Sequence, residues 1–144
     1  MENSDTRKLL QECDAGAKMA VTSIDEVLEK VCDSDMKHLL QESKKHHEKL
    51  GNEIHSLLDR CDTDEKDPSP MAKGMSWLKT NMTLGMDNSD ATVADLITDG
   101  CNMGIKSLNK YLNEYEQADS SAKRLCKELT DIEEQLCTKL ERYL

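Results

Sequence analysis

Four hydrophobic seams, in which inward-facing residues are spaced alternately three and four apart, constrain this chain more than any other feature. Two seams run through residues 10–31 and 36–61, and two more run through residues 94–115 and 122–143. This spacing places the members of a seam on one side of an α-helix and leaves charged residues on the other sides. Such helices bury their seams against each other, so the sequence predicts an all-α four-helix bundle.

The second half of the chain repeats the first. Residues 10–31 align with residues 94–115, and residues 36–58 align with residues 122–144, with identities such as Gly16 with Gly100 and Leu50 with Leu136. We interpret the chain as a single domain, residues 1–144, built from a duplicated helical hairpin. Hairpin 1 is expected over about residues 4–60 and hairpin 2 over about residues 90–144. A tight turn near Asp33 divides the first hairpin.

A long connection at residues 61–89 joins the two hairpins. Ser69 and Pro70 predict a helix start, and the following apolar residues, which include the only tryptophan, Trp77, predict a short amphipathic helix. Because each hairpin is tightly turned and this connection is long, we expect it to cross the length of the bundle. The sequence therefore predicts an up-down-down-up topology with a short extra helix in the crossover, as in ferritin-like folds.

Composition excludes several classes of function. The net charge is −10, with one Trp and three Tyr, so phosphates would be repelled and few rings could stack on bases. We expect no binding of nucleic acid. No apolar stretch is long enough to span a bilayer, so no membrane association is expected. The acidic, polar N-terminus is unlike a secretory signal, which predicts a cytoplasmic protein.

The duplicated hairpin, the crossover segment Pro-Met-Ala-Lys-Gly-Met-Ser-Trp-Leu-Lys at residues 70–79 and the segment Val-Ala-Asp-Leu-Ile-Thr-Asp-Gly at residues 93–100 resemble a bacterial family. This family consists of ferritin-like four-helix-bundle proteins of unknown function. The resemblance covers nearly the whole chain, and its motifs are mostly structural. The wider superfamily includes rubrerythrins and ferritins, so the resemblance implies a bundle and, in the active branches, a di-iron centre.

A di-iron centre requires a set of ligand residues that this sequence lacks. Two helices should each supply an inward Glu, and the other two should each supply Glu-x-x-His. By the resemblance, Ala17 and its repeat mate Cys101 occupy the two Glu positions. The remaining helices carry Lys-x-x-His47 and Thr-x-x-Glu133. Only His47 keeps the expected residue type, so we expect no di-iron oxidase or ferroxidase activity.

The same positions leave a polar layer at mid-bundle, where His47, Cys101 and Glu133 are expected at similar height. One interpretation is a mononuclear metal site for zinc or iron, completed by His46 or Glu134. The interpretation we favour is a buried, hydrogen-bonded His–Glu pair, because an imidazole partner offsets much of the cost of burying a carboxylate. It needs no cofactor, whereas the alternative needs one transition-metal ion. The remaining histidines lie off the seam and are expected to face water: His38, His46 and His55.

Six cysteines raise the question of redox chemistry, although none forms a C-x-x-C motif. Four lie in the seams, where a reduced thiol serves as a small apolar residue. The other two, Cys32 and Cys137, are better candidates for exposure. A redox-sensing role would need a thiolate favoured by nearby cations, and Lys30 and Lys139 are the neighbouring lysines.

These observations predict a non-enzymatic structural or interaction protein that forms a homodimer or binds a protein partner. The alternative is a metal-binding or redox protein, related to stress, that uses the mid-bundle layer of His47, Cys101 and Glu133. Nothing in the sequence resembles a phosphate loop, a dinucleotide-binding motif or a catalytic triad.

Overall fold

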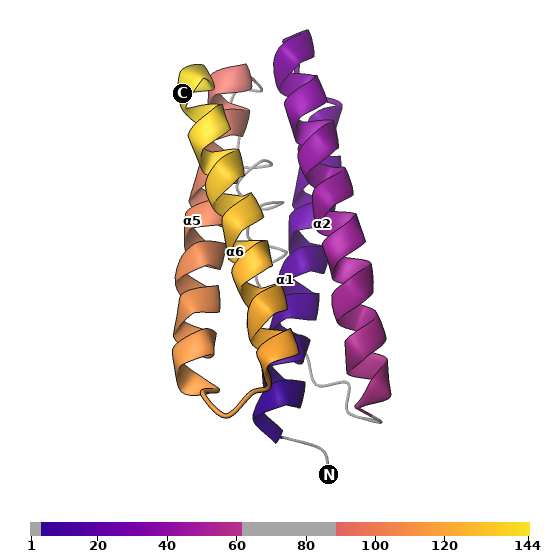
Figure 1. The fold of residues 1–144 in the computed structure, drawn as a ribbon. Coiled ribbons are helices and arrows are strands. Elements are labelled where there is room, and N and C mark those ends of the chain that lie inside the picture. Colours follow the sequence, from indigo (N-terminus) through magenta and orange to yellow (C-terminus); the bar gives the residue numbers. More distant parts are fainter. Residues whose placement is uncertain (1–3, 62–88) are drawn as a thin grey trace.

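The computed structural model describes residues 4–61 and 89–144, and these residues form four long helices and no strand (Figure 1). The long helices are α1 (Ser4–Leu28), α2 (Ser34–Arg60), α5 (Asp90–Glu114) and α6 (Ser120–Leu140), followed by the 3-10 helix η1 (Glu141–Tyr143). The prediction of an all-α four-helix bundle is confirmed. The predicted crossover helix lies outside the described residues.

Side chains at the helix starts explain where three of the helices begin. Asp33 caps α2 by accepting hydrogen bonds from the backbone N–H groups of Asp35 and Met36. Ser89 caps α5, and Asp119 caps α6 in the same way. Such caps satisfy N–H groups that have no partner within the helix. The predicted break near Asp33 is confirmed, and the turns of the two hairpins span residues 29–33 and 115–119.

The helices form two antiparallel pairs, α1 with α2 and α5 with α6, which lie side by side (Figure 1). At one end of the bundle, the turn between α1 and α2 meets the start of α5. There the Asp90 carboxylate accepts the backbone N–H of Cys32 at 2.8 Å and that of Asp33 at 2.9 Å. The first residue of hairpin 2 is thereby tied to the turn of hairpin 1.

The opposite end of the bundle repeats this arrangement. Thr6, at the start of α1, accepts the backbone N–H of Asp119 through its hydroxyl oxygen at 2.8 Å, and Asp5 accepts that of Gln117 at 3.0 Å. In the alignment of the two hairpins, Thr6 corresponds to Asp90 and Asp33 corresponds to Asp119. The same contact is thus made twice, which supports the interpretation of a duplicated hairpin.

The apolar core consists of two clusters separated by polar side chains at mid-bundle. One cluster is centred on residues such as Leu10, Ile54 and Leu125, and the other on residues such as Ile24 and Leu140. Each helix buries a stripe wider than its seam, so several apolar residues outside the seams are also buried: Leu9, Leu58, Val93, Leu96 and Leu125. Near some ends of the seams, four residues are only partly buried although they still pack against the core clusters: Cys61, Tyr111, Tyr115 and Tyr143.

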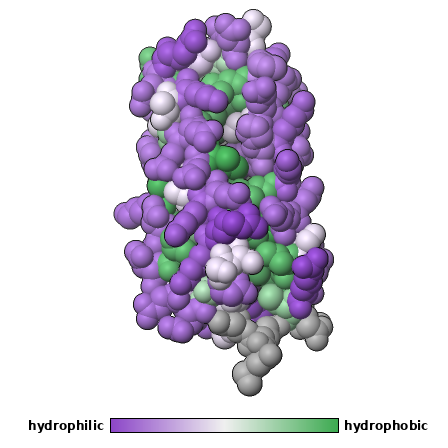
Figure 2. Space-filling view, viewed as in Figure 1, coloured by the Kyte–Doolittle hydropathy of each residue, from purple (hydrophilic) through white to green (hydrophobic). Residues whose placement is uncertain are grey.

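The surface agrees with the acidic, polar composition. On the face viewed in Figure 2, hydrophilic side chains predominate, and apolar atoms appear only in small separate patches. Among the described helices, none combines the length and the apolar character that crossing a bilayer requires.

Candidate functional site: a buried polar layer at mid-bundle

His47 of α2 and Glu133 of α6 form the centre of the polar layer. The His47 side chain is fully buried, and Glu133 is 7% exposed. His47 Nε2 and Glu133 Oε2 lie 3.0 Å apart, within hydrogen-bonding distance. The predicted contact between two helices that are far apart in sequence is therefore present. It arises because the seams of α2 and α6 both turn inward at this level.

The second ring nitrogen of His47 faces a group that can only accept a hydrogen bond. Nδ1 lies 2.8 Å from the backbone oxygen of Ser43, and the Ser43 hydroxyl is 3.4 Å away. A carbonyl oxygen can only accept, so Nδ1 carries a proton and donates it to Ser43. One further proton then lies between Nε2 and Oε2. It makes the pair either an imidazolium donating to a carboxylate or a carboxyl donating to a neutral imidazole.

Gly104 of α5 makes room for the Glu133 carboxylate. A Cβ atom added to Gly104 would overlap with Glu133 Oε1. The second carboxylate oxygen therefore rests against the backbone of α5, while the first binds His47. The seam pattern placed Gly104 on the inner side of its helix but contained no signal that a carboxylate would fill this space.

Cys101 of α5 extends the layer beyond Glu133. Cys101 is 4% exposed, and its thiol lies near the Cys137 thiol and the Glu133 carboxylate. The interaction with Cys137, then burial, then the charge of Glu133 raise the pKa of Cys101 far above the ordinary thiol value. The same interaction lowers the pKa of Cys137, against the opposing effects of burial and of nearby carboxylates that include Glu133.

A second thiol pair lies in the apolar core below the layer. Cys13 of α1 lies near Cys126 of α6, and both residues are fully buried. The interaction with Cys126 and burial raise the pKa of Cys13, and the Cys126 sulfur lies 3.6 Å from the backbone oxygen of Leu108. The seam pattern placed these cysteines inside the bundle but did not pair them. Their pairing depends on how α1 and α6 meet diagonally.

The positions that the resemblance assigns to di-iron ligands do not fit two iron ions. Lys44 forms an ion pair with Asp25 of α1 at 2.5 Å, at the surface between α1 and α2. Thr130 donates its hydroxyl hydrogen to the Cys126 backbone oxygen of its own helix at 3.0 Å. Ala17 is buried and carries no ligand atom. Of the six positions, three have side chains in the layer with an atom that could bind a metal: His47, Cys101 and Glu133.

Those three residues are the ones predicted as alternative metal ligands, and they meet through Glu133. It contacts His47 on one side and Cys101 on the other. The proposed additional ligands His46 and Glu134 are exposed. Within residues 4–61 and 89–144, no three His, Cys, Asp or Glu side chains are grouped so that they could hold a metal ion. A metal-binding role for the layer stays a prediction.

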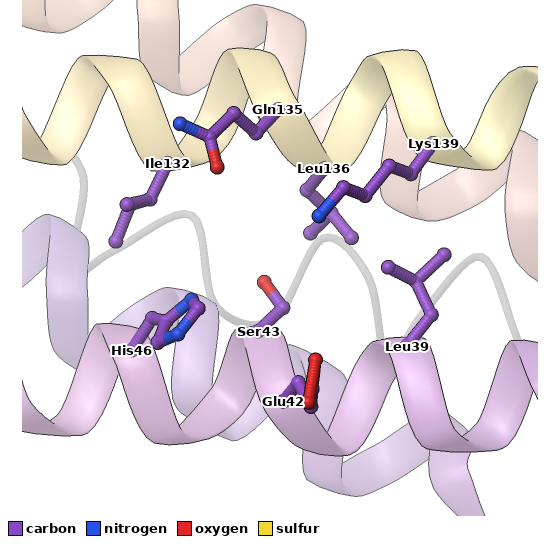
Figure 3. A pocket seen from close by; sticks show the side chains of 8 residues that line it. All are labelled: Leu39, Glu42, Ser43, His46, Ile132, Gln135, Leu136 and Lys139. Carbon is purple, nitrogen blue, oxygen red and sulfur yellow. The ribbon is translucent and has the colours of Figure 1, made fainter.

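A small pocket lies between α2 and α6 on the outer side of the layer (Figure 3). Its volume of about 20 Å³ suffices for about one water molecule. Ser43 points from α2 into this pocket, with His46 and Lys139 on its two sides in Figure 3. The residues that line it come from these two helices: Leu39, Glu42, Ser43, His46, Ile132, Gln135, Leu136 and Lys139.

A buried acidic residue on α1 was not predicted from the sequence. Asp14 is 8% exposed, and its carboxylate binds Lys18 at 2.9 Å and lies 3.4 Å from Nδ1 of His55. His55 is exposed as predicted, and so are His38 and His46. Asp14 lies beside the seam residue Cys13, so its burial follows from the close approach of α2 rather than from the seam.

Comparisons with known proteins add no relative: no family model, no curated protein and no solved structure matches this chain.

Proposed function

We propose that this protein is a ferritin-like bundle whose di-iron positions have become a structural polar layer, and that it acts without catalysis by associating with a second copy of itself. The proposal includes the up-down-down-up order of a ferritin-like fold. Its support is the pair of contacts at the bundle ends, Asp90 with the first turn and Thr6 with the second. These contacts bring the start of each hairpin to the turn of the other.

The observation that carries the proposal is that both ring nitrogens of His47 are engaged within the protein. Nδ1 donates to Ser43, and Nε2 shares a proton with Glu133. Because both nitrogens have partners within the protein, the ring needs no metal ion to satisfy it, which supports a structural role for the layer. The replaced di-iron positions Ala17, Lys44 and Thr130 support the same interpretation.

Self-association is the part of the proposal that an experiment can test directly. Among the described residues, Met103 of α5 and Leu144 are the exposed large hydrophobic residues, with Met103 52% exposed. Light scattering coupled to size-exclusion chromatography should show a dimer or larger species at micromolar concentration. Met103→Asp should shift it toward monomer, whereas the control Lys45→Asp on exposed α2 surface should not. A strictly monomeric wild-type protein would contradict the proposal.

A second candidate function is metal binding by His47, Cys101 and Glu133, with zinc or iron as the ion. The observation that favours it is the position of Glu133 between the other two residues. In addition, Nδ1 of His47 donates to a backbone oxygen, which is the usual arrangement of a histidine that ligates a metal through Nε2.

Elemental analysis separates the two candidates. Protein expressed with added zinc, iron and manganese should contain well under one equivalent of each metal if the layer is structural. Near-stoichiometric metal that is lost in His47→Ala and kept in the exposed control His38→Ala would establish the metal site instead.

A further inference from the structure

The thiols of Cys101 and Cys137 form a contact between α5 and α6 that the structural role of the layer does not explain. The Cys137 sulfur lies 3.9 Å from the backbone oxygen of Thr98 and 3.7 Å from Oδ1 of Asn102. These two residues flank Cys101 on the same turn of α5. The sulfur of Cys137 is therefore seated against the turn of α5 that carries Cys101, which brings the two thiols close enough to interact.

The two sulfurs differ in their access to solvent. Cys101 is 4% exposed, whereas Cys137 is partly exposed at the edge between α5 and α6. The other thiol pair, Cys13 with Cys126, is fully buried in the core. Cys32 is exposed on the turn of the first hairpin. Cys137 therefore combines partial access from solvent with a second thiol close by on the neighbouring helix.

From this arrangement we propose that Cys137 and Cys101 are an oxidation site, at which a hydroperoxide converts the two thiols into a disulfide. The accessible Cys137 reacts first and the shielded Cys101 resolves the product. The inference does not depend on self-association or on metal binding.

The chemistry balances in two steps. The Cys137 sulfur, after its proton has left to solvent, attacks one peroxide oxygen; an S–O bond forms, the O–O bond breaks, and the departing oxygen takes up a proton as alcohol or water. The Cys101 sulfur then attacks the Cys137 sulfur; an S–S bond forms, the S–O bond breaks, and the hydroxyl leaves with the Cys101 proton as water. The two thiols lose two electrons in all, and the peroxide gains them. A dithiol reductant reverses the result.

Peptide mapping of the intact chain tests the proposal. Reduced protein is treated with one equivalent of hydrogen peroxide in the presence of a metal chelator, remaining thiols are blocked, and the digest is analysed by mass spectrometry. We expect a peptide pair linked through Cys101 and Cys137 that dithiothreitol separates, while Cys13 and Cys126 stay reduced. In Cys101→Ser the linked pair should be lost, and a sulfenic acid at Cys137 should react with dimedone.

The controls make the result decisive. Cys32→Ser should leave the yield of the linked pair unchanged, and circular dichroism should show that each variant keeps its helices. The proposal is overturned if the wild-type chain, folded throughout, gives no linkage between Cys101 and Cys137. It is equally overturned if linkage appears only after denaturation, or if oxidation occurs at Cys32 while Cys137 stays reduced.

Discussion

At the scale of single residues, His47 and Glu133 decide the character of the interior. A buried ion or carboxyl group without a hydrogen-bond partner lowers the stability of the folded state. Two buried polar groups that hydrogen-bond each other destabilise it little more than two apolar side chains in their place would. The His47 ring has such partners: Glu133 lies 3.0 Å from Nε2, and Nδ1 donates to the backbone oxygen of Ser43. The two residues should therefore behave as a unit in stability measurements.

We expect Glu133→Ala to lower the free energy of unfolding by about 1–3 kcal/mol, because it leaves the His47 ring without its partner. Replacing both residues by Leu should cost less than this single change. Urea denaturation measures both effects, and Glu134→Ala, an exposed change at the next position, is the matched control. A double variant that is less stable than Glu133→Ala would show that the pair contributes to stability beyond its mutual hydrogen bond.

At the scale of a helix, α5 carries two glycines with different surroundings. A Cβ on Gly104 would overlap with Glu133, whereas a Cβ on Gly100 would meet nothing within 4 Å. Glycine within a helix costs about 0.5–1 kcal/mol relative to alanine when nothing else intervenes. An alanine at Gly100 therefore tests helix propensity alone, whereas an alanine at Gly104 also tests packing against the Glu133 carboxylate.

Gly100→Ala should raise the free energy of unfolding by about 0.5–1 kcal/mol through helix propensity alone. Gly104→Ala should instead lower it, because the Glu133 carboxylate must move away from α5 and its bond to His47 is disturbed. Thermal unfolding followed by circular dichroism distinguishes the two signs. If both substitutions stabilised the protein, the carboxylate would have room that the structure does not show.

At the scale of the whole molecule, the two hairpins are joined by hydrogen bonds at both ends of the bundle. The Asp90 carboxylate accepts two hydrogen bonds from backbone N–H groups in the turn of hairpin 1. Bonds to a charged acceptor are stronger than bonds between neutral groups. The carboxylate also lies in the first turn of α5, where a negative charge is favourable.

Asp90→Ala should lower the free energy of unfolding by about 1–2 kcal/mol, the value typical of losing hydrogen bonds to a charged group near solvent. Asp90→Asn, which keeps one acceptor oxygen, should lose less. Asp95→Ala, exposed on the same helix, removes an equal charge and should change stability little. Equal losses for Asp90→Ala and Asp95→Ala would mean that the contact between hairpins contributes nothing.

The buried thiols make stability depend on alkaline pH. The raised pKa values of Cys13 and Cys101 mean that the folded chain keeps protons that the unfolded chain releases near the ordinary value of 9.0. Their contribution is complete below this pH and is lost as the pH rises above it, by up to about 1.4 kcal/mol per pH unit for each thiol.

Urea denaturation under reducing conditions between about pH 8 and pH 11 measures this loss. Since lysines and tyrosines also titrate there, the comparison is between variants. Cys101→Ala should show a shallower decline than the wild-type chain, and the exposed Cys32→Ala should show the same decline. An unchanged slope in Cys101→Ala would contradict the raised pKa.

The amino-acid sequence determined the elements and their inward faces. Alternating spacing identified the four helices, Asp33 indicated the first turn, and the seams brought His47 and Glu133 to the interior. These features depend on local patterns, because burial of an apolar stripe and capping of a helix involve residues close together in the chain. The predicted ligand role of His47, Cys101 and Glu133 is not settled by such patterns.

Which inward residues contact each other depends on how the four helices pack. This packing placed the Glu133 carboxylate over Gly104, paired Cys101 with Cys137, and set Asp90 against the turn of the other hairpin. Each contact depends on the rotation of one helix about its axis and on its shift along its neighbour. A single helix carries no information about either quantity, since both result from packing four helices together at close contact.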